Sequence, residues 1–106
     1  MSRPFIDRDF SIGRISIALA PPTHAKGGLL GWATVYANGF IVDGVAIRMT
    51  SDDLLIVTLP ARARGELGRR HPIVRIANRD HRQQFDDAVI DAFREAWANR
   101  GKGGAT

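Results

Sequence analysis

The segment LGWATVYANGFIVDGVAIRM, residues 30–49, predicts an antiparallel pair of strands. Before Asn38-Gly39 the segment is rich in aromatic and β-branched residues, whose side chains suit the pleated surface of a strand. Asn38-Gly39 is the strongest hairpin signal in the chain, because both residues tolerate the positive φ angles of a type I′ turn. In the returning strand the apolar alternation slips at Asp43-Gly44, and a bulge at Gly44 restores it. The segment therefore predicts a hairpin of strands over residues 30–37 and 40–49.

Three other segments also have the pattern of strands. From Ser11 to Ala20, isoleucine and leucine alternate with arginine, serine and alanine, as in a half-buried strand. Leu54 to Leu59 is apolar on both faces, which predicts a central strand that is covered on both sides. Ile73 to Ala77 predicts a short fifth strand. Pro21-Pro22 and Pro60 end the strands before them, because proline lacks the amide that a β-ladder needs.

The C-terminal part of the chain predicts one amphipathic helix and a frayed tail over residues 99–106. Asn78 or Asp80 can cap the first turn by accepting a backbone N–H that has no partner inside the helix. Apolar residues at three- and four-residue spacing form one face of this helix. They are Phe85, Ala88, Val89, Ala92, Phe93 and Ala96. The outer side is acidic, with Asp86, Asp87, Asp91 and Glu95.

These elements define an α+β fold of four or five antiparallel strands followed by one C-terminal helix. The chain has 106 residues, the length of one domain, and we expect its core over residues 11–97. One helix, about 10 Å wide, covers only one face of such a sheet, since neighbouring strands lie about 4.8 Å apart. The second face of strand 54–59 needs another cover. We expect it from a second copy of the chain, in a two-fold dimer.

Positive charge is concentrated between residues 61 and 82. Seven arginines oppose Glu66 and Asp80 there, a formal charge of +5, whereas the whole chain carries +4. Arginine presents a rigid fork of N–H donors that matches phosphate oxygens, so this cluster indicates an anionic partner. A solvated loop that keeps the protein soluble is the alternative. We expect Arg62, Arg64, Arg69 and Arg70 to contact phosphates from a loop whose glycines let backbone amides approach an anion.

Three further residues belong to the predicted nucleic-acid site. Arg79 and Arg82 lie at the start of the helix, where exposed amides and the positive end of the dipole attract phosphate. His71 precedes Pro72, which favours an extended backbone at the entry to a strand. His71 is therefore either architectural or a contact for a phosphate or a base.

The aromatic residues allow two interpretations. Trp32 and Tyr36 fall on the same face of their strand and can form a stacking platform for single-stranded bases. Alternatively, they pack under the helix or in a dimer seam. Trp97 is core or interface by the same reasoning.

Composition and motifs argue against other classes of protein. The chain has no cysteine, which excludes disulfides and thiolate zinc sites and favours the cytoplasm. No apolar run approaches the roughly 20 residues that cross a membrane, and the N-terminal stretch lacks the apolar core of a signal peptide. No metalloprotease, P-loop or nucleophile motif occurs. We therefore expect no enzyme, no catalytic residues, no metal, no cofactor and no small-molecule substrate.

The order of elements and motifs is similar to that of the SpoVG family of bacterial regulatory proteins. The matching motifs are Phe40-Ile41-Val42, Leu59-Pro60, Gly65-Glu66-Leu67 and His71-Pro72-Ile73. Ala61-Arg62-Ala63 stands at the basic turn of the family, with Ala63 in place of its second basic residue. The chain resembles the family over residues 11–97, and the resemblance implies a dimer that binds DNA and RNA.

Two functions fit these observations. The first is a homodimeric regulator of expression in the bacterial cytoplasm that binds DNA or RNA through paired arginine loops. The second is a protein-interaction module that docks an acidic partner protein. Both are electrostatic, and competition by unrelated DNA and RNA separates them.

Overall fold

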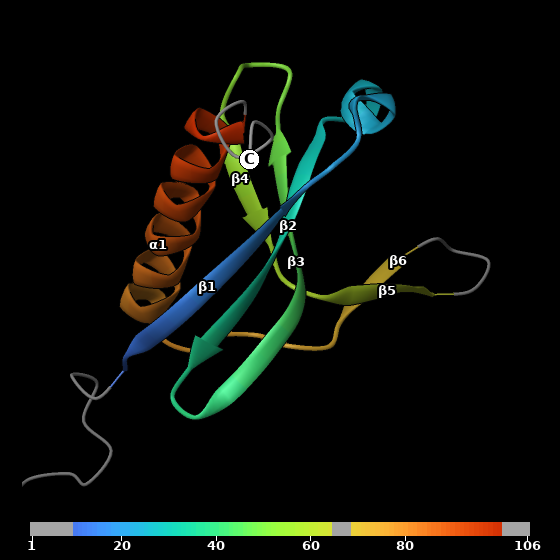
Figure 1. Cartoon of the computed structure of the whole chain (residues 1–106). Helices are drawn as coiled ribbons and strands as arrows, with labels where there is room; N and C mark the ends of the chain where they lie inside the picture. The colour runs from blue at the N-terminus through green and yellow to red at the C-terminus, as the bar shows by residue number, and fades with distance from the viewer. Residues whose placement is uncertain (1–9, 65–68, 101–106) are drawn as a thin grey trace, which may run out of the picture.

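The computed structural model describes residues 10–64 and 69–100, and for residues 24–26, 62–64 and 69–72 it describes the backbone alone. In this part of the chain a four-stranded antiparallel sheet packs against one helix, and a two-stranded hairpin projects to the side (Figure 1). The sheet has the order β1-β2-β3-β4, and the hairpin is β5-β6. The elements are β1 Ile12–Leu19, the 3₁₀ helix η2 Pro22–Gly27, β2 Leu29–Ala37, β3 Phe40–Met49, β4 Leu55–Thr58, β5 Ala61–Arg64, β6 Arg69–Pro72 and α1 Arg79–Ala98. The predicted α+β class is confirmed.

The β2–β3 hairpin has the geometry that its sequence predicts. Asn38 and Gly39 both have positive φ, 51° and 81°, as a type I′ turn requires. The ladder pairs Ala33 with Val45 and then Val35 with Val42, so two residues of β3 lie opposite one residue of β2. Gly44, with φ 76°, is one of these two residues, which confirms the predicted bulge.

The helix α1 lies across one face of the sheet and contacts β1, β2 and β4. The side-chain oxygen of Asn78 accepts a hydrogen bond from the His81 amide at 3.0 Å, so Asn78 caps the helix. Phe85, Val89 and Phe93 are the buried residues of the predicted apolar face. They close a core with Ala33, Val35, Val45, Ile47, Val57 and Leu59. The buried core of the described residues therefore comes from one face of the sheet, from Leu59 just after β4, and from one face of the helix.

The prediction that residues 54–59 form a central strand is wrong. β4 is an edge strand, paired with β3 on one side only. Val57 and Leu59 point into the core, whereas the Leu54 and Ile56 side chains are 61% and 42% exposed. The strand is at the edge because no later segment of the described chain joins the sheet beside it.

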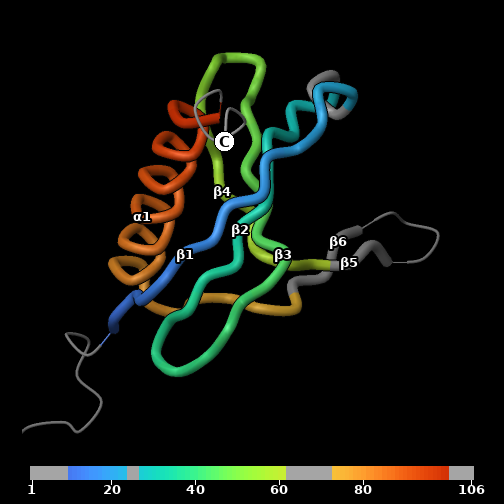
Figure 2. The backbone as a smooth tube through the Cα atoms, in the orientation of Figure 1, coloured from blue at the N-terminus to red at the C-terminus, as the bar shows by residue number. Residues whose placement is uncertain are grey.

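The prediction of a fifth strand over residues 73–77 is also wrong. The strand lies earlier, at Arg69–Pro72, and pairs with Ala61–Arg64 instead of joining the main sheet. Residues 73–77 then lead from the hairpin to the start of α1 without a ladder partner (Figure 2). His71-Pro72 accordingly ends a strand, where the sequence predicted the entry to one.

In the described ranges, no helix is both long and apolar enough to cross a membrane. The predicted tail lies outside the described residues from residue 101 onward.

Candidate nucleic-acid interface

The segment predicted as an arginine loop is a β-hairpin. Its register pairs Arg62 with His71, Ala63 with Arg70 and Arg64 with Arg69. Opposite residues of an antiparallel pair have Cα atoms about 4.5–5.5 Å apart. The hairpin thus brings all four predicted arginines, and His71, into three adjacent rungs. We call β5 and β6 the arginine hairpin; the side chains of residues 62–72 lie outside the description.

The arginine hairpin leaves the body of the protein at a defined root. The Ile73 amide donates to the Pro60 carbonyl at 3.0 Å and closes the base of the hairpin. Beyond this bond the hairpin projects away from the four-stranded sheet (Figure 1). Four cations on a short projecting element repel one another, so an anion that binds there relieves this repulsion. The arrangement suits a polyanion.

The two predicted arginines at the helix start have different environments. Arg79 is exposed. Arg82 donates from Nε to Asp86 Oδ1 and from Nη2 to the Val57 carbonyl, both at 2.7 Å. These bonds give Arg82 a structural role in the free protein, so a phosphate there reaches only its remaining donors. The structure does not bring either residue onto the arginine hairpin.

The face of the sheet turned away from α1 carries polar and aromatic side chains together with the exposed Ile41 and Ile56, and we call it the open face. On β2 the buried Ala33 and Val35 alternate with Trp32, Thr34 and Tyr36, which are half-buried on the open face. The interpretation that Trp32 and Tyr36 pack under the helix is therefore wrong. Their position leaves the base-stacking and dimer-seam interpretations.

Polar contacts order the open face between its aromatic residues. The Arg14 guanidinium lies over the Tyr36 ring, 4.6 Å from its centroid. Thr34 Oγ1 donates to Asp43 Oδ1 at 3.0 Å, so the one carboxylate at the β3 bulge is hydrogen-bonded to a neighbouring strand. Arg14 was missing from the sequence-based site, although its alternation with Ile15 already placed it on the exposed side of β1.

A cleft of about 520 Å³ lies where the open face meets the root of the arginine hairpin. Its walls are mostly small residues, and they leave room beside the strands. Arg48 enters it from β3, with Nη1 donating to the Gly27 carbonyl at 3.2 Å. The lining residues are Gly44, Ala46, Arg48, Thr58, Leu59, Pro60 and Ala61. No local pattern in the sequence indicates this cleft, because the cleft depends on where the hairpin leaves the sheet.

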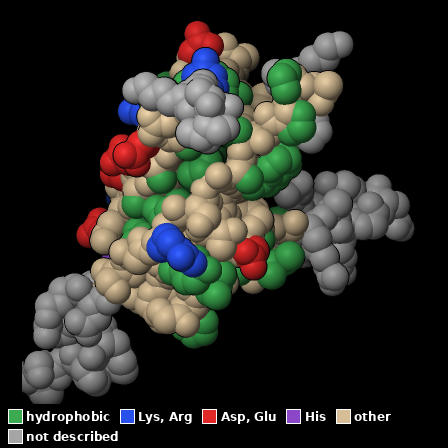
Figure 3. All heavy atoms as spheres, viewed as in Figure 1, with side chains coloured by type: hydrophobic (Ala, Val, Ile, Leu, Met, Phe, Trp, Pro, Cys, Tyr) green, Lys and Arg blue, Asp and Glu red, His purple; other side chains and the backbone are tan. Residues whose placement is uncertain are grey.

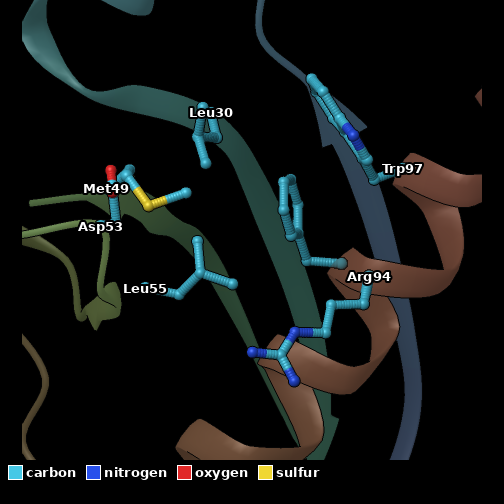
Figure 4. A pocket seen from close by; sticks show the side chains of 7 residues that line it. Leu30, Met49, Asp53, Leu55, Arg94 and Trp97 are labelled. Carbon is cyan, nitrogen blue, oxygen red and sulfur yellow. The ribbon is translucent and has the colours of Figure 1, made fainter.

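A second hollow, of about 400 Å³, is apolar and lies at the C-terminal end of α1. Leu30, Met49 and Leu55 lie across it from Trp97 (Figure 4), and Asp53, Phe93 and Arg94 complete its lining. The Trp97 side chain packs on Phe93, with ring centroids 5.8 Å apart, and is 42% exposed.

Exposed acidic side chains lie along the outer side of α1. Asp87, Asp91 and Glu95 are exposed on the outer side of α1, as predicted. Acidic side chains gather along that edge, whereas hydrophobic side chains are visible over the strands (Figure 3). Within the described residues, no group of three or more His, Cys, Asp or Glu side chains is placed to hold a metal ion.

Comparisons with known proteins give no relative: no protein-family model matches the chain, and no curated protein matches it.

Proposed function

We propose that this chain is a nucleic-acid-binding regulatory protein that contacts DNA or RNA phosphates through the arginine hairpin. The observation that carries the proposal is the β5–β6 register, which gathers Arg62, Arg64, Arg69 and Arg70 on one projecting element. Arginine donors match phosphate oxygens, and phosphate contacts supply most of the affinity in such complexes. The SpoVG-like motifs around the same segment support this function.

The division of charge supports one orientation of the bound nucleic acid. The hairpin and the acidic side of α1 have opposite formal charge, so a polyanion is attracted to the first and repelled by the second. Arg79 and Arg82 at the helix start are secondary contacts in this proposal, and His71 lies beside Arg62 in register.

In this proposal the protein works as a homodimer in the bacterial cytoplasm, and its function is binding rather than catalysis. Leu54 and Ile56, exposed beside the free edge of β4, are the apolar side chains that a second copy would cover. Two-fold symmetry places two arginine hairpins on one assembly.

The test is a binding titration against duplex DNA, single-stranded DNA and RNA over a range of salt concentrations. Each phosphate contact adds about −0.9 to the slope of log affinity against log salt for duplex DNA. Arg69→Ala with Arg70→Ala should weaken binding to every sequence and flatten the slope by up to about 2. The matched control is Arg94→Ala with Arg100→Ala, which removes the same charge from the far end of α1 and should change the slope much less.

A variant that lacks all four hairpin arginines, stays folded and binds as tightly as the parent would overturn the proposal. Binding to an acidic protein that survives an excess of unrelated DNA and RNA would instead favour the protein-interaction module.

A further inference from the structure

We propose that the open face and its cleft bind single-stranded nucleic acid, with bases stacked on Trp32 and on the Arg14–Tyr36 pair. The inference rests on the proposed function and deepens it, because it assigns the class of nucleic acid and a second contact surface. Three features of the open face carry it: the position of its aromatic side chains, the charge around them, and the cleft that joins them to the arginine hairpin.

The aromatic side chains are held by the most rigid part of the sheet. β2 is paired on both sides, with β1 and with β3. The Cα partners of Trp32 are Ala18 on β1 and Ala46 on β3, so small side chains flank the indole on both sides. Tyr36 lies on the same face, about 13 Å further along the strand at 3.3 Å per residue. Two rings at this distance take two separate bases.

The charge of the open face fits a polyanion. The Arg14 guanidinium lies over the Tyr36 ring, so a base at that end stacks on the guanidinium plane, and Arg48 lines the cleft together with Ala46, the strand partner of Trp32. Asp43 is the carboxylate of this face, and its hydrogen bond from Thr34 satisfies part of its acceptor capacity. Stacked bases and arginine contacts to the backbone are the two components of single-strand binding surfaces.

The cleft joins the two surfaces into one path. Pro60 and Ala61 line its outer wall and begin the arginine hairpin, while Ala46 lines its inner wall and is the strand partner of Trp32. A volume of about 520 Å³ admits a base, and the Arg48 guanidinium and the Thr58 hydroxyl supply polar groups. A single-stranded nucleic acid that runs along the arginine hairpin therefore reaches the cleft first and the aromatic residues next.

A duplex cannot use this path. Its bases are stacked on one another and present only their edges in the grooves, so their faces do not reach a sheet surface. The hairpin contacts phosphates in either form, whereas the open face contacts only unpaired bases. The protein should therefore bind single strands more tightly than duplexes of the same sequence.

The chain has two tryptophans, and they lie on different surfaces, which gives a direct test. Trp97→Phe leaves Trp32 as the only indole, and Trp32→Phe leaves Trp97 at the end of α1. Oligo(dT), an abasic oligomer of equal length and a duplex are titrated into each single-tryptophan variant. We expect oligo(dT) to quench Trp32 fluorescence, the abasic oligomer to bind without quenching, and Trp97 to be insensitive to both.

Affinity provides the second readout. Trp32→Ala should weaken oligo(dT) binding by about tenfold or more, the order expected for one stacked base, and leave duplex binding within about twofold. Circular dichroism checks the fold, and Tyr36→Leu replaces Trp32→Ala should that variant unfold. Tyr36→Leu should likewise weaken the binding of oligo(dT) and leave the binding of duplex unchanged.

The outcomes separate this inference from the function on which it rests. Tight oligo(dT) binding that leaves Trp32 unquenched, with single strand and duplex bound equally, overturns the open-face assignment and leaves the hairpin function standing. Quenching of Trp32 that persists at unchanged affinity when the four hairpin arginines are removed supports the open face and overturns the hairpin. Shielding of Trp32 from iodide in the free protein would show that the indole is already covered before nucleic acid binds, and would also overturn the assignment.

Discussion

The side chain of Arg82 in the first turns of α1 donates from Nη2 to the carbonyl oxygen of Val57 at 2.7 Å. Val57 lies on the edge strand β4, whose outer side has no ladder partner in the described chain. The same guanidinium pairs with Asp86, four residues along the helix, at 2.7 Å. One side chain thus ties the helix to the edge of the sheet, and it gives an outward carbonyl the donor that a neighbouring strand would have supplied.

Arg82→Ala should therefore lower the free energy of unfolding by about 1–3 kcal/mol, because the Val57 carbonyl and the Asp86 carboxylate both lose a donor. Arg79→Ala is the matched control, since Arg79 is an exposed arginine in the same turn and should change stability by no more than about 0.5 kcal/mol. Chemical denaturation measures both. Equal effects of the two substitutions would show that stability depends on the charge at the helix start and not on the hydrogen bond to Val57.

Neighbouring residues of β4 should respond differently to an added charge. Val57 is 7% exposed and faces the helix, so Val57→Lys should unfold the chain or cost several kcal/mol through an unpaired buried charge. Ile56 is 42% exposed on the opposite face, so Ile56→Lys should leave the fold intact and split the dimer. Circular dichroism measures the loss of the fold, and light scattering measures the loss of the dimer. A parent that has the 11.6 kDa monomer mass at micromolar concentration would contradict the dimer.

Two adjacent glycines, Gly27 and Gly28, should differ sharply in how well they tolerate substitution by alanine. Gly28 has φ 81°, and a Cβ placed on it would lie 2.6 Å from the Met49 carbonyl oxygen. Gly27 has no atom within 4 Å of the corresponding position. Gly28→Ala should therefore destabilise the protein by at least about 1 kcal/mol, from backbone strain and overlap. Thermal denaturation should show Gly27→Ala close to the parent, and similar midpoints for the two variants would exclude the close approach of Gly28 to β3.

The acidic side of α1 should oppose nucleic-acid binding without taking part in it. Asp91→Asn with Glu95→Gln removes two exposed negative charges, so binding should stay equal or become slightly tighter, most visibly at low salt. Asp86 is left unchanged because it pairs with Arg82. Salt-dependent titrations measure the effect, and a clear loss of affinity would place the partner on the helix instead.

Local patterns in the sequence predict most of the main sheet and the helix. Asn38-Gly39 tolerates positive φ, the slipped alternation at Gly44 requires an extra residue, and the three- and four-residue spacing from Phe85 to Phe93 predicts a buried stripe. Each of these signals depends on residues close together in the chain. The structure agrees with all of them.

The position of β4 depends on contacts between distant residues, which the local pattern does not contain. An apolar run such as Leu54–Leu59 fits a central strand, but whether a strand is central depends on what pairs with it later in the chain. Here the candidate partner, residues 73–77, forms no ladder, and β5 pairs with residues 69–72 instead. The arginines of the candidate site were found by charge, and the alternation with Ile15 could have indicated Arg14, whereas Arg48 and the cleft required the register of the strands.

The root of the arginine hairpin also has a consequence for how the protein can change over generations. Among the described residues no ladder joins the hairpin to the four-stranded sheet, and the bond from the Ile73 amide to the Pro60 carbonyl closes its base. Substitutions in β5 and β6 therefore leave the helix-facing core untouched. Selection can alter the chemistry of this projection, and with it the partner that is recognised, while the scaffold beneath keeps its stability.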